Sequence, residues 1–332
     1  MNVASLKGKN NEGVLVAVIL ALLIFMAIMA PGSLNLAFAG DIIRSGLVNM
    51  CLALGVLMVI IAGGFDVSFM AIAITAAYST VLIMQSTSWD GRITPFFVSI
   101  TIGLVFALPN VILIAYYRVP TLMATLGTQT IIRGTLLAFV GSTYIAQLPA
   151  GLDSVGRASL FTLGSSPVSI LLIPIIVLCI GIAFFLGKTY YGRAIYAIGG
   201  DPEAAERAGI PVFRVQALLL LLAGGIAGFA GMVHVSLNRT ANPFDLVGGE
   251  LDVIAAVVIG GALDTGGRGS VKGTVLGVLL IALVRNSLIR LGVPSFWHTF
   301  AIGLVVLIGV AVQALSNRRR GHQTPILEGA DK

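Results

Sequence analysis

The sequence predicts an all-α membrane protein that crosses the bilayer about ten times and carries one short polar helix between two of its spans. Composition is the first observation behind this prediction. Of the 332 residues, 57% are hydrophobic and only 10% are charged, with a mean hydropathy of +1.01, whereas about a quarter of the residues of a soluble domain are charged. The second is that the apolar residues occur in long runs. A single transmembrane domain over residues 1–332 is therefore expected.

Ten apolar segments approach the length of about 20 residues that a helix needs to cross the hydrocarbon core. They are 14–30, 46–62, 67–85, 95–117, 120–140, 167–186, 214–235, 250–263, 272–290 and 295–315. The first is long for the core of a secretory signal, so it is interpreted as a retained span after a cytoplasmic segment, residues 1–13. The eighth is short and rich in glycine, and is expected to be broken or only partly inserted. Residues 316–332 are polar and predict a cytoplasmic tail.

The basic residues follow membrane topology. If the amino terminus is cytoplasmic, thirteen of them fall on the cytoplasmic side: Lys7, Lys9, Arg118, Lys188, Arg193, Arg207, Arg214, Arg268, Lys272, Arg318, Arg319, Arg320 and Lys332. Five fall on the opposite side: Arg44, Arg92, Arg157, Arg239 and Arg290. This distribution obeys the positive-inside rule and predicts that both termini are cytoplasmic. The net charge of +6 therefore indicates membrane topology and not a nucleic-acid partner.

A polar stretch at 199–211, GGDPEAAERAGIP, lies between two apolar segments. Asp201 is suited to cap a helix, and Pro202 stands at the first helical position, where its missing N–H costs nothing. Glu203 places negative charge at the positive end of the helix dipole. Gly209, two residues before a proline, is suited to end the helix in a left-handed cap. The sequence predicts a helix of about two turns, which is either an ordinary loop or a docking element for another protein.

Threonines occupy one face of the fifth predicted span. Thr121, Thr125, Thr128 and Thr135 lie within an arc of roughly 80°, and Gln129 lies at its edge. Hydroxyl and amide groups exchange hydrogen bonds with a polyol without the fixed charge that would trap it, so this face is a candidate substrate path. The alternative interpretation is that the hydroxyls bond back to helix carbonyls and pack against a neighbouring helix.

Ionisable residues within spans are few, and each is a candidate functional residue. Asp66 follows two glycines, and it either caps the third span or contributes to the substrate path. Arg133 lies deeper, on the fifth span. It either pairs with a carboxylate or backbone carbonyls inside the bundle, or extends its charged end to the membrane surface.

No motif for catalysis, metal binding or nucleotide binding is evident. The stretch 266–274, GGRGSVKGT, resembles a phosphate-binding loop but lacks the required lysine followed by serine or threonine. No HExxH or CxxC spacing occurs. We expect no catalytic residue, no metal and no cofactor on this chain, so any ATP that drives it must be bound by another chain.

Glycines mark a further candidate site, near the eighth span. Gly260, Gly261, Gly266 and Gly267 permit an unwound turn at the cytoplasmic face, with a role in gating or in contacting a partner. The apolar run and paired glycines of 253–265 are similar to those of 56–68, which suggests an internal repeat. Both copies run in the same direction across the predicted membrane, which does not fit a simple inverted repeat.

Several of these stretches resemble a known family. Glu203, Ala204 and Ala205, followed by Gly209, resemble the EAA signature of the membrane subunits of bacterial ABC importers. Four stretches resemble the ribose and autoinducer-2 branch of those permeases: 55–68, 119–135, 191–210 and 250–277. The resemblance covers nearly the whole chain. One departure is Met70, where the family usually has glycine.

The resemblance implies a permease subunit of the bacterial inner membrane that imports a monosaccharide or a similar small polar solute by alternating access. It implies an ATP-binding subunit, a periplasmic solute-binding protein and a second permease, identical or similar. The residues expected to dock the ATP-binding subunit are Asp201, Glu203, Ala204, Ala205, Arg207 and Gly209. The alternatives are a permease for branched-chain amino acids or nucleosides and, from another class, an ion-coupled secondary transporter.

Overall fold

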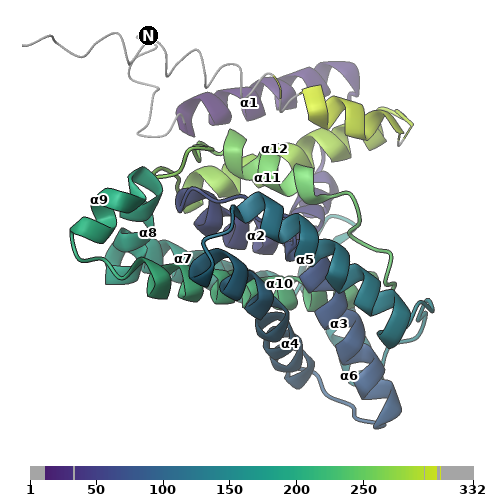
Figure 1. Ribbon diagram of the computed structural model, residues 1–332. Helices are drawn as coiled ribbons and strands as arrows, with labels where there is room; N and C mark the ends of the chain where they lie inside the picture. The colour runs from purple at the N-terminus through teal and green to yellow at the C-terminus, as the bar shows by residue number, and fades with distance from the viewer. Residues whose placement is uncertain (1–11, 33, 295, 305–306, 308–332) are drawn as a thin grey trace, which may run out of the picture.

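The computed structural model of the chain describes residues 12–32, 34–294, 296–304 and 307. The predicted tail, 316–332, and residues 1–11 of the predicted amino-terminal segment lie outside the described residues, as does most of the tenth predicted span. The described chain is a bundle of helices with one small hairpin (Figure 1), so the predicted class of all-α membrane protein is confirmed apart from that hairpin.

The elements follow one another along the chain with few long connections. In order they are α1 (Glu12–Met29), α2 (Leu36–Ile61), α3 (Phe69–Ser86), α4 (Thr94–Asn110), the π-helix η1 (Val111–Tyr116), α5 (Thr121–Thr135), the π-helix η2 (Leu136–Val140), α6 (Ala150–Arg157), β1 (Ser159–Leu163), β2 (Ser166–Ser169), α7 (Leu172–Lys188), α8 (Tyr190–Gly200), α9 (Pro202–Arg207), α10 (Val212–Asn238), α11 (Glu250–Ile259) and α12 (Val271–Arg290).

Fewer helices qualify as complete spans than the ten predicted. Among the described residues, five are long and apolar enough to cross a membrane: α2, α3, α4 with η1, α10 and α12. A sixth span is possible if α7 and α8, which meet at a bend of 70°, are counted as one. The eighth predicted span is α11, whose ten residues extend about 15 Å, half of the hydrocarbon core of about 30 Å.

Two predicted boundaries are wrong. The second span begins at Leu36 and not at 46, where Asn35 caps α2 by accepting a hydrogen bond from the backbone N–H of Phe38 at 2.9 Å. The first turns of α2 contain polar residues that interrupt the apolar run in the sequence. One of them, Asp41, forms an ion pair with Arg290 at 2.9 Å. The sixth span begins at Leu172 and not at 167, because the preceding residues pair as the antiparallel hairpin of β1 and β2.

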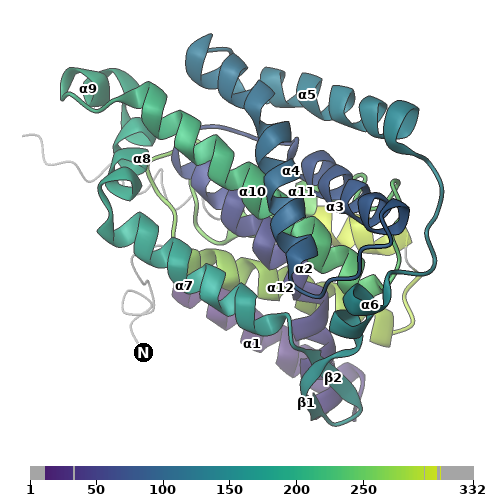
Figure 2. The ribbon, with the colours of Figure 1, turned by 90° about the horizontal axis from the view of Figure 1, so that it is seen from below.

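Helix α10 lies at the centre of the bundle, against α2, α3 and α4 (Figure 2). Small residues allow this close packing. A side chain at Gly228 would overlap the carbonyl of Ser99 on α4, and one at Gly231 would overlap the carbonyl of Ala73 on α3. The Ser99 hydroxyl also donates to the Gly228 carbonyl at 2.7 Å. Close backbone approach of this kind is a main source of helix association in membranes, where apolar burial drives little.

Three of the described arginines mark the two ends of the bundle. At the end that carries α9, Arg118 pairs with Glu206 at 3.0 Å. At the other end, which carries α6, Arg44 donates to the carbonyl of Leu237 at 3.2 Å, and Arg239, which follows α10, binds α6. Figure 1 shows α9 and α6 at opposite ends of the bundle. The sequence likewise assigns Arg118 to one side of the membrane and Arg44 and Arg239 to the other, and which end is cytoplasmic stays a prediction.

One carboxylate, Asp153, fastens α6 to the end of α10. It accepts hydrogen bonds from Nε of Arg239 at 2.6 Å and from Nε of Arg157 at 2.7 Å. The hydrogen bond from Arg239, supported by that from Arg157 and by both positive charges, lowers the pKa of Asp153 below its ordinary value, although desolvation opposes the shift. A lowered folded-state pKa means that the stabilisation is complete above the unfolded value of about 3.9 and is lost as the pH falls through the folded value.

We therefore expect the hydrogen-exchange protection of α6, corrected for intrinsic rates, to decline below about pH 4. Asp153→Asn removes the charge and should give low protection in α6 at neutral pH with little further dependence on pH. The measurement is exchange mass spectrometry on the reconstituted protein, with α10 as the internal reference. Equal protection of α6 in the two proteins throughout this range would contradict the role of Asp153.

Candidate functional site

Helix α9 is the predicted polar helix, with both predicted ends. Oδ1 of Asp201 accepts a hydrogen bond from the backbone N–H of Ala204 at 3.0 Å, and Pro202 stands at the first helical position. At the other end Gly209 adopts a φ of +81°. The N–H of Ile210 reaches back to the carbonyl of Ala205 at 3.1 Å, which completes a left-handed cap.

Of the residues predicted to dock a partner, all but Ala205 are exposed. Asp201, Glu203, Ala204, Arg207 and Gly209 are exposed. Ala205 is only 4% exposed and belongs to the hydrophobic core, so its methyl group holds α9 onto the bundle and is not available to a partner. The helix therefore has a polar, exposed surface, and Ala205 anchors its other side in the hydrophobic core.

An ion pair joins α9 to a neighbouring span. Glu203 and Arg207, four residues apart, suggest an intrahelical pair, but among the described residues they form no salt bridge. Glu206 instead pairs with Arg118, at the end of the α4–η1 span. This exposed pair ties α9 to a neighbouring span and leaves Glu203 and Arg207 unpaired within the described chain.

Three backbone segments meet directly before α9. We call this contact the glycine junction. Gly63 belongs to the first segment, Gly199 to the second, and Gly266 and Gly267 to the third. A Cβ on Gly199 would overlap the carbonyl oxygen of Ile61 and lie 2.6 Å from the backbone nitrogen of Gly267. A Cβ on Gly266 would lie 2.8 Å from Cα of Gly63. The N–H of Gly267 donates to the Ile61 carbonyl at 2.8 Å. The ends of α8 and α2 and the connection between α11 and α12 thus touch without intervening side chains.

The two other predicted gating glycines lie at the end of α11. Gly260 packs on α12, where a Cβ would lie 2.6 Å from the carbonyl oxygen of Gly273. Gly261 has a φ of +93° and ends α11. The predicted unwound turn is present, since residues 260–270 are not helical, and the junction places it against α8, which leads into α9.

The internal similarity noted in the sequence corresponds to a repeated helix end. The N–H of Gly64 donates to the carbonyl of Val59 at 3.0 Å, and the N–H of Ala262 donates to the carbonyl of Val257 at 3.3 Å. The glycine between donor and helix has a positive φ in both copies, +83° at Gly63 and +93° at Gly261. Helices α2 and α11 therefore end in the same left-handed cap, and each is followed by a non-helical break and a new helix.

A chain of buried polar side chains runs from α5 through α4 to the break between α2 and α3. The Thr128 hydroxyl donates to Oδ1 of Asn110 at 2.6 Å, and Nδ2 of Asn110 donates to the Ser68 hydroxyl at 2.8 Å. Ser68 in turn donates to Asp66 from its backbone N–H at 2.7 Å and from its hydroxyl at 2.6 Å. The carboxylate of Asp66 therefore bonds within the break between α2 and α3 and does not cap α3, whose N-cap residue is Ser68.

The remaining predicted path residues line the same face of α5. The Thr125 hydroxyl donates to the carbonyl of Phe65 at 3.2 Å, and Thr121 lies against Gly64. Gln129 lies farther along α5, where its Nε2 donates to Oε1 of Glu250 at 2.9 Å. Thr125 and Thr128 are directed into the bundle and hydrogen-bonded there, as the packing interpretation predicts, and the substrate path stays a prediction.

Arg133 forms an ion pair with Glu250 at the start of α11. Of the two interpretations of Arg133 from the sequence, pairing inside the bundle is therefore the one observed. Glu250 is 8% exposed, and a buried carboxylate of this kind requires such a partner. The pair and Gln129 together link α5 to α11.

Four residues of this arrangement were not predicted as site residues from the sequence: Ser68, Asn110, Gly199 and Glu250. Asn110 could have been found, because an amide next to Pro109 inside an apolar run is costly unless it has a partner. Ser68 and Glu250 each stand at the start of a helix and look like ordinary capping residues. Nothing local distinguishes Gly199 from the exposed Gly200 beside it.

These features are those of a multi-pass membrane protein with a short, exposed polar helix at one end. A sequence model of the family described as "Branched-chain amino acid transport system / permease component" matches residues 38–310. The chain belongs to this family of ABC importer permeases, which pass a small solute through the inner membrane while a separate subunit hydrolyses ATP. It is therefore a transport subunit and not an enzyme.

Within this family, the chain is similar to curated permeases that are named for autoinducer 2 import. The autoinducer 2 import system permease protein LsrC of Yersinia enterocolitica serotype O:8 is 32% identical over 91% of this chain and 82% of its own length. The proteins of the same name from Yersinia pseudotuberculosis (strain YPIII) and Yersinia pestis (strain Pestoides F) are 31% and 32% identical, over 91% of this chain and 84% of theirs. No solved structure matches the chain.

Proposed function

We propose that this permease imports a sugar or a similar small, uncharged polar solute by alternating access, and that the solute passes along the inner face of α5. The observation that carries the proposal is the row of uncharged hydrogen-bonding side chains from Thr121 to Gln129, continued by Asn110 and Ser68. Such groups exchange hydrogen bonds with hydroxyl groups at little net cost. The relatives named for autoinducer 2 import support a solute of this kind.

The charged residues near this face argue against the competing solutes. A substrate carboxylate, as in a branched-chain amino acid, would favour a free arginine, but Arg133 is held by Glu250. Coupling to sodium or protons would favour an available carboxylate. Asp66 is occupied by Ser68, and Asp252 is paired with Arg285.

The partners follow from the two ends of the bundle. We infer that the α9 end is cytoplasmic and receives the ATP-binding subunit, and that the α6 end faces the periplasm and receives the solute-binding protein. The outward face of α5 is apolar and exposed, with Leu122, Met123 and Ile131 between 47% and 71% exposed. A second permease subunit, identical or similar, covers this face and completes the path.

The substrate path is tested by replacing Thr125 and Thr128 together with valine. Valine keeps the shape of threonine and removes the hydroxyl, and each lost hydrogen bond is worth about 0.5–1.5 kcal/mol. Uptake of labelled autoinducer 2 or ribose at low concentration should therefore fall about tenfold, while leucine is not taken up by either protein. The matched control is Thr130→Val, since Thr130 is exposed and bonds only the carbonyl of Leu126 within its own helix.

Copurification of the ATP-binding subunit and the melting temperature show whether the double variant still assembles. If it assembles and imports as well as Thr130→Val, the threonine face serves packing alone and the proposed path is wrong.

A further inference from the structure

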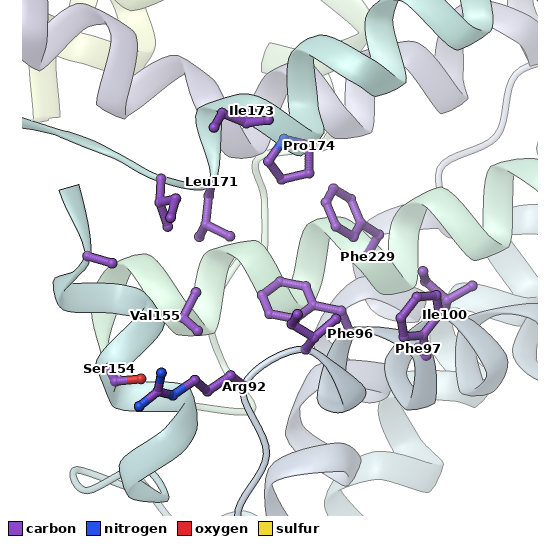
Figure 3. Close-up of a pocket in the computed structure, with 13 residues that line it drawn as sticks. Arg92, Phe96, Phe97, Ile100, Ser154, Val155, Leu171, Ile173, Pro174 and Phe229 are labelled. Atoms are coloured by element: carbon purple, nitrogen blue, oxygen red, sulfur yellow. The ribbon is translucent and has the colours of Figure 1, made fainter. Parts of the chain in front are cut away.

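An apolar cavity of about 680 Å³ is lined by residues of α4, α6, α7 and α10 (Figure 3), and α6 lies at the end of the bundle opposite α9 (Figure 1). Phe96 and Ile100 of α4 line one side, and Pro174 of α7 lines the other. Phe229 of α10 forms part of its lining between them, and Val155 of α6 lies toward its end. We call this cavity the outer pocket. Its volume is in the range of sites for small molecules, about 300–1,000 Å³.

The outer pocket is continuous with the lipid-facing surface. Ile93 and Phe97 on the α4 side are 69% and 63% exposed, and Ile173 on the α7 side is 50% exposed. Phe97 lies on α4, which with η1 is long and apolar enough to span a membrane, Ile93 directly precedes it, and Ile173 lies on the apolar helix α7. We infer that their exposed atoms face lipid. An apolar cavity holds water poorly, because water needs polar partners there. Its chemistry therefore suits a hydrocarbon chain.

Two polar side chains contribute to the lining: the guanidinium of Arg92 at the rim, and the hydroxyl of Ser154, which donates to the carbonyl of Gly151 at 2.6 Å. Arg92 is exposed and lines the pocket immediately before α4 begins at Thr94. Within the described residues it forms no hydrogen bond or ion pair, whereas Arg157 and Arg239 at the same end both bind Asp153. Helix α4 also begins without a side-chain cap, so the positive end of its dipole lies beside the same charge.

We propose that the outer pocket binds one anionic phospholipid of the outer leaflet, with an acyl chain between α4 and α7 and the phosphate on Arg92. The positions of the charge and of the apolar lining match the phosphate and the acyl chain of a phospholipid. Arg92 stands at the end of a span, and the apolar lining begins within one turn of it. A guanidinium is the side chain best suited to a phosphate because it offers several donors in one plane. The bound lipid fills the groove over α10 and links the starts of α4 and α7.

The test is native mass spectrometry of the full chain, purified in detergent and supplied with phosphatidylglycerol or with a zwitterionic lipid of the same chains. We expect one phosphatidylglycerol to remain bound to the wild-type chain. Arg92→Ala should lower its retention about tenfold, the factor expected for one lost charge-assisted hydrogen bond. Ile173→Trp, which fills the mouth of the pocket, should lower the retention of both lipids.

Two variants serve as matched controls. Arg157→Ala removes a positive charge from the same end without touching the pocket, and Ile176→Trp adds the same bulk at an exposed α7 position outside the lining. Both should retain lipid as the wild type does. Inorganic phosphate in excess should not displace the lipid, because the acyl chain contributes most of the binding. Equal retention in Arg92→Ala and Arg157→Ala would overturn the proposal, as would loss of the lipid when the partner subunits assemble.

Discussion

Replacing Gly209 with valine should abolish the ATP hydrolysis that the loaded solute-binding protein stimulates, and should prevent copurification of the ATP-binding subunit. At a φ of +81° a β-branched residue is strained by about 1–3 kcal/mol. No atom lies within 4 Å of a Cβ at this position, so the strain acts on the cap and not through a clash. A helix of six residues is too short to persist without its caps, and the proposed docking surface is lost with it.

The matched control is Gly248→Val. Gly248 has a φ of +82° and equally empty surroundings, but lies in the connection between α10 and α11 that follows the α6 end of α10. It should carry the same backbone strain and leave copurification of the ATP-binding subunit unchanged. Glu203→Lys tests the docking surface without backbone strain, because it reverses a charge at the positive end of the helix dipole. Normal copurification with both Gly209→Val and Glu203→Lys would show that α9 is a passive connection.

Replacing Gly199 with alanine should stop transport while leaving α9 itself intact. The added methyl group would overlap the carbonyl of Ile61 and contact the nitrogen of Gly267, and neither backbone group can move as a side chain does. Inserting one methyl group into a tight contact typically costs about 1–3 kcal/mol. The ends of α2 and α8 must separate, and the hydrogen bond from Gly267 to Ile61 is lost. The measurement is solute uptake by vesicles that contain the assembled transporter.

Gly200→Ala is the control for this variant. Gly200 is the next residue in the same helix, and no atom lies within 4 Å of a Cβ built on it. It should transport at the wild-type rate. Equal uptake by the two alanine variants would mean that the close contact at Gly199 plays no part in transport.

The extent to which the sequence predicted this site depends on how local each feature is. Both ends of α9 were predictable, because the cap of Asp201 and the left-handed turn at Gly209 are each completed within about five residues. The face of α5 on which the threonines lie was equally predictable from helical periodicity. What that face contacts was not, since Thr128 meets an asparagine on α4 and Thr125 meets the break before α3.

Contacts between distant parts of the chain account for the other differences. Gly199 is set apart from Gly200 only by the carbonyl of Ile61, which lies far from it in the sequence. The start of α2 was placed too late because Asp41 and Arg44 interrupt the apolar run. Their partners, Arg290 and the carbonyl of Leu237, come from α12 and α10. A membrane helix tolerates such charges where the fold supplies partners, and the fold cannot be read from the segment itself.

We expect α9 and the breaks after α2 and α11 to move as one unit, because the glycine junction brings their backbones into direct contact. Spin labels on Glu203→Cys and Asp264→Cys report on α9 and on the second break, both exposed. A third label on Thr162→Cys in β1 marks the opposite end, with the half-buried Cys179 replaced by serine.

The decisive measurement is the set of distances between these labels in the assembled transporter, before and after ATP binds. We predict that the distance between 203 and 264 stays constant, while the distance from each of them to 162 changes. A change in the distance between 203 and 264, with the distance from 264 to 162 constant, would show that α9 moves independently of the breaks. That result would contradict their movement as one unit.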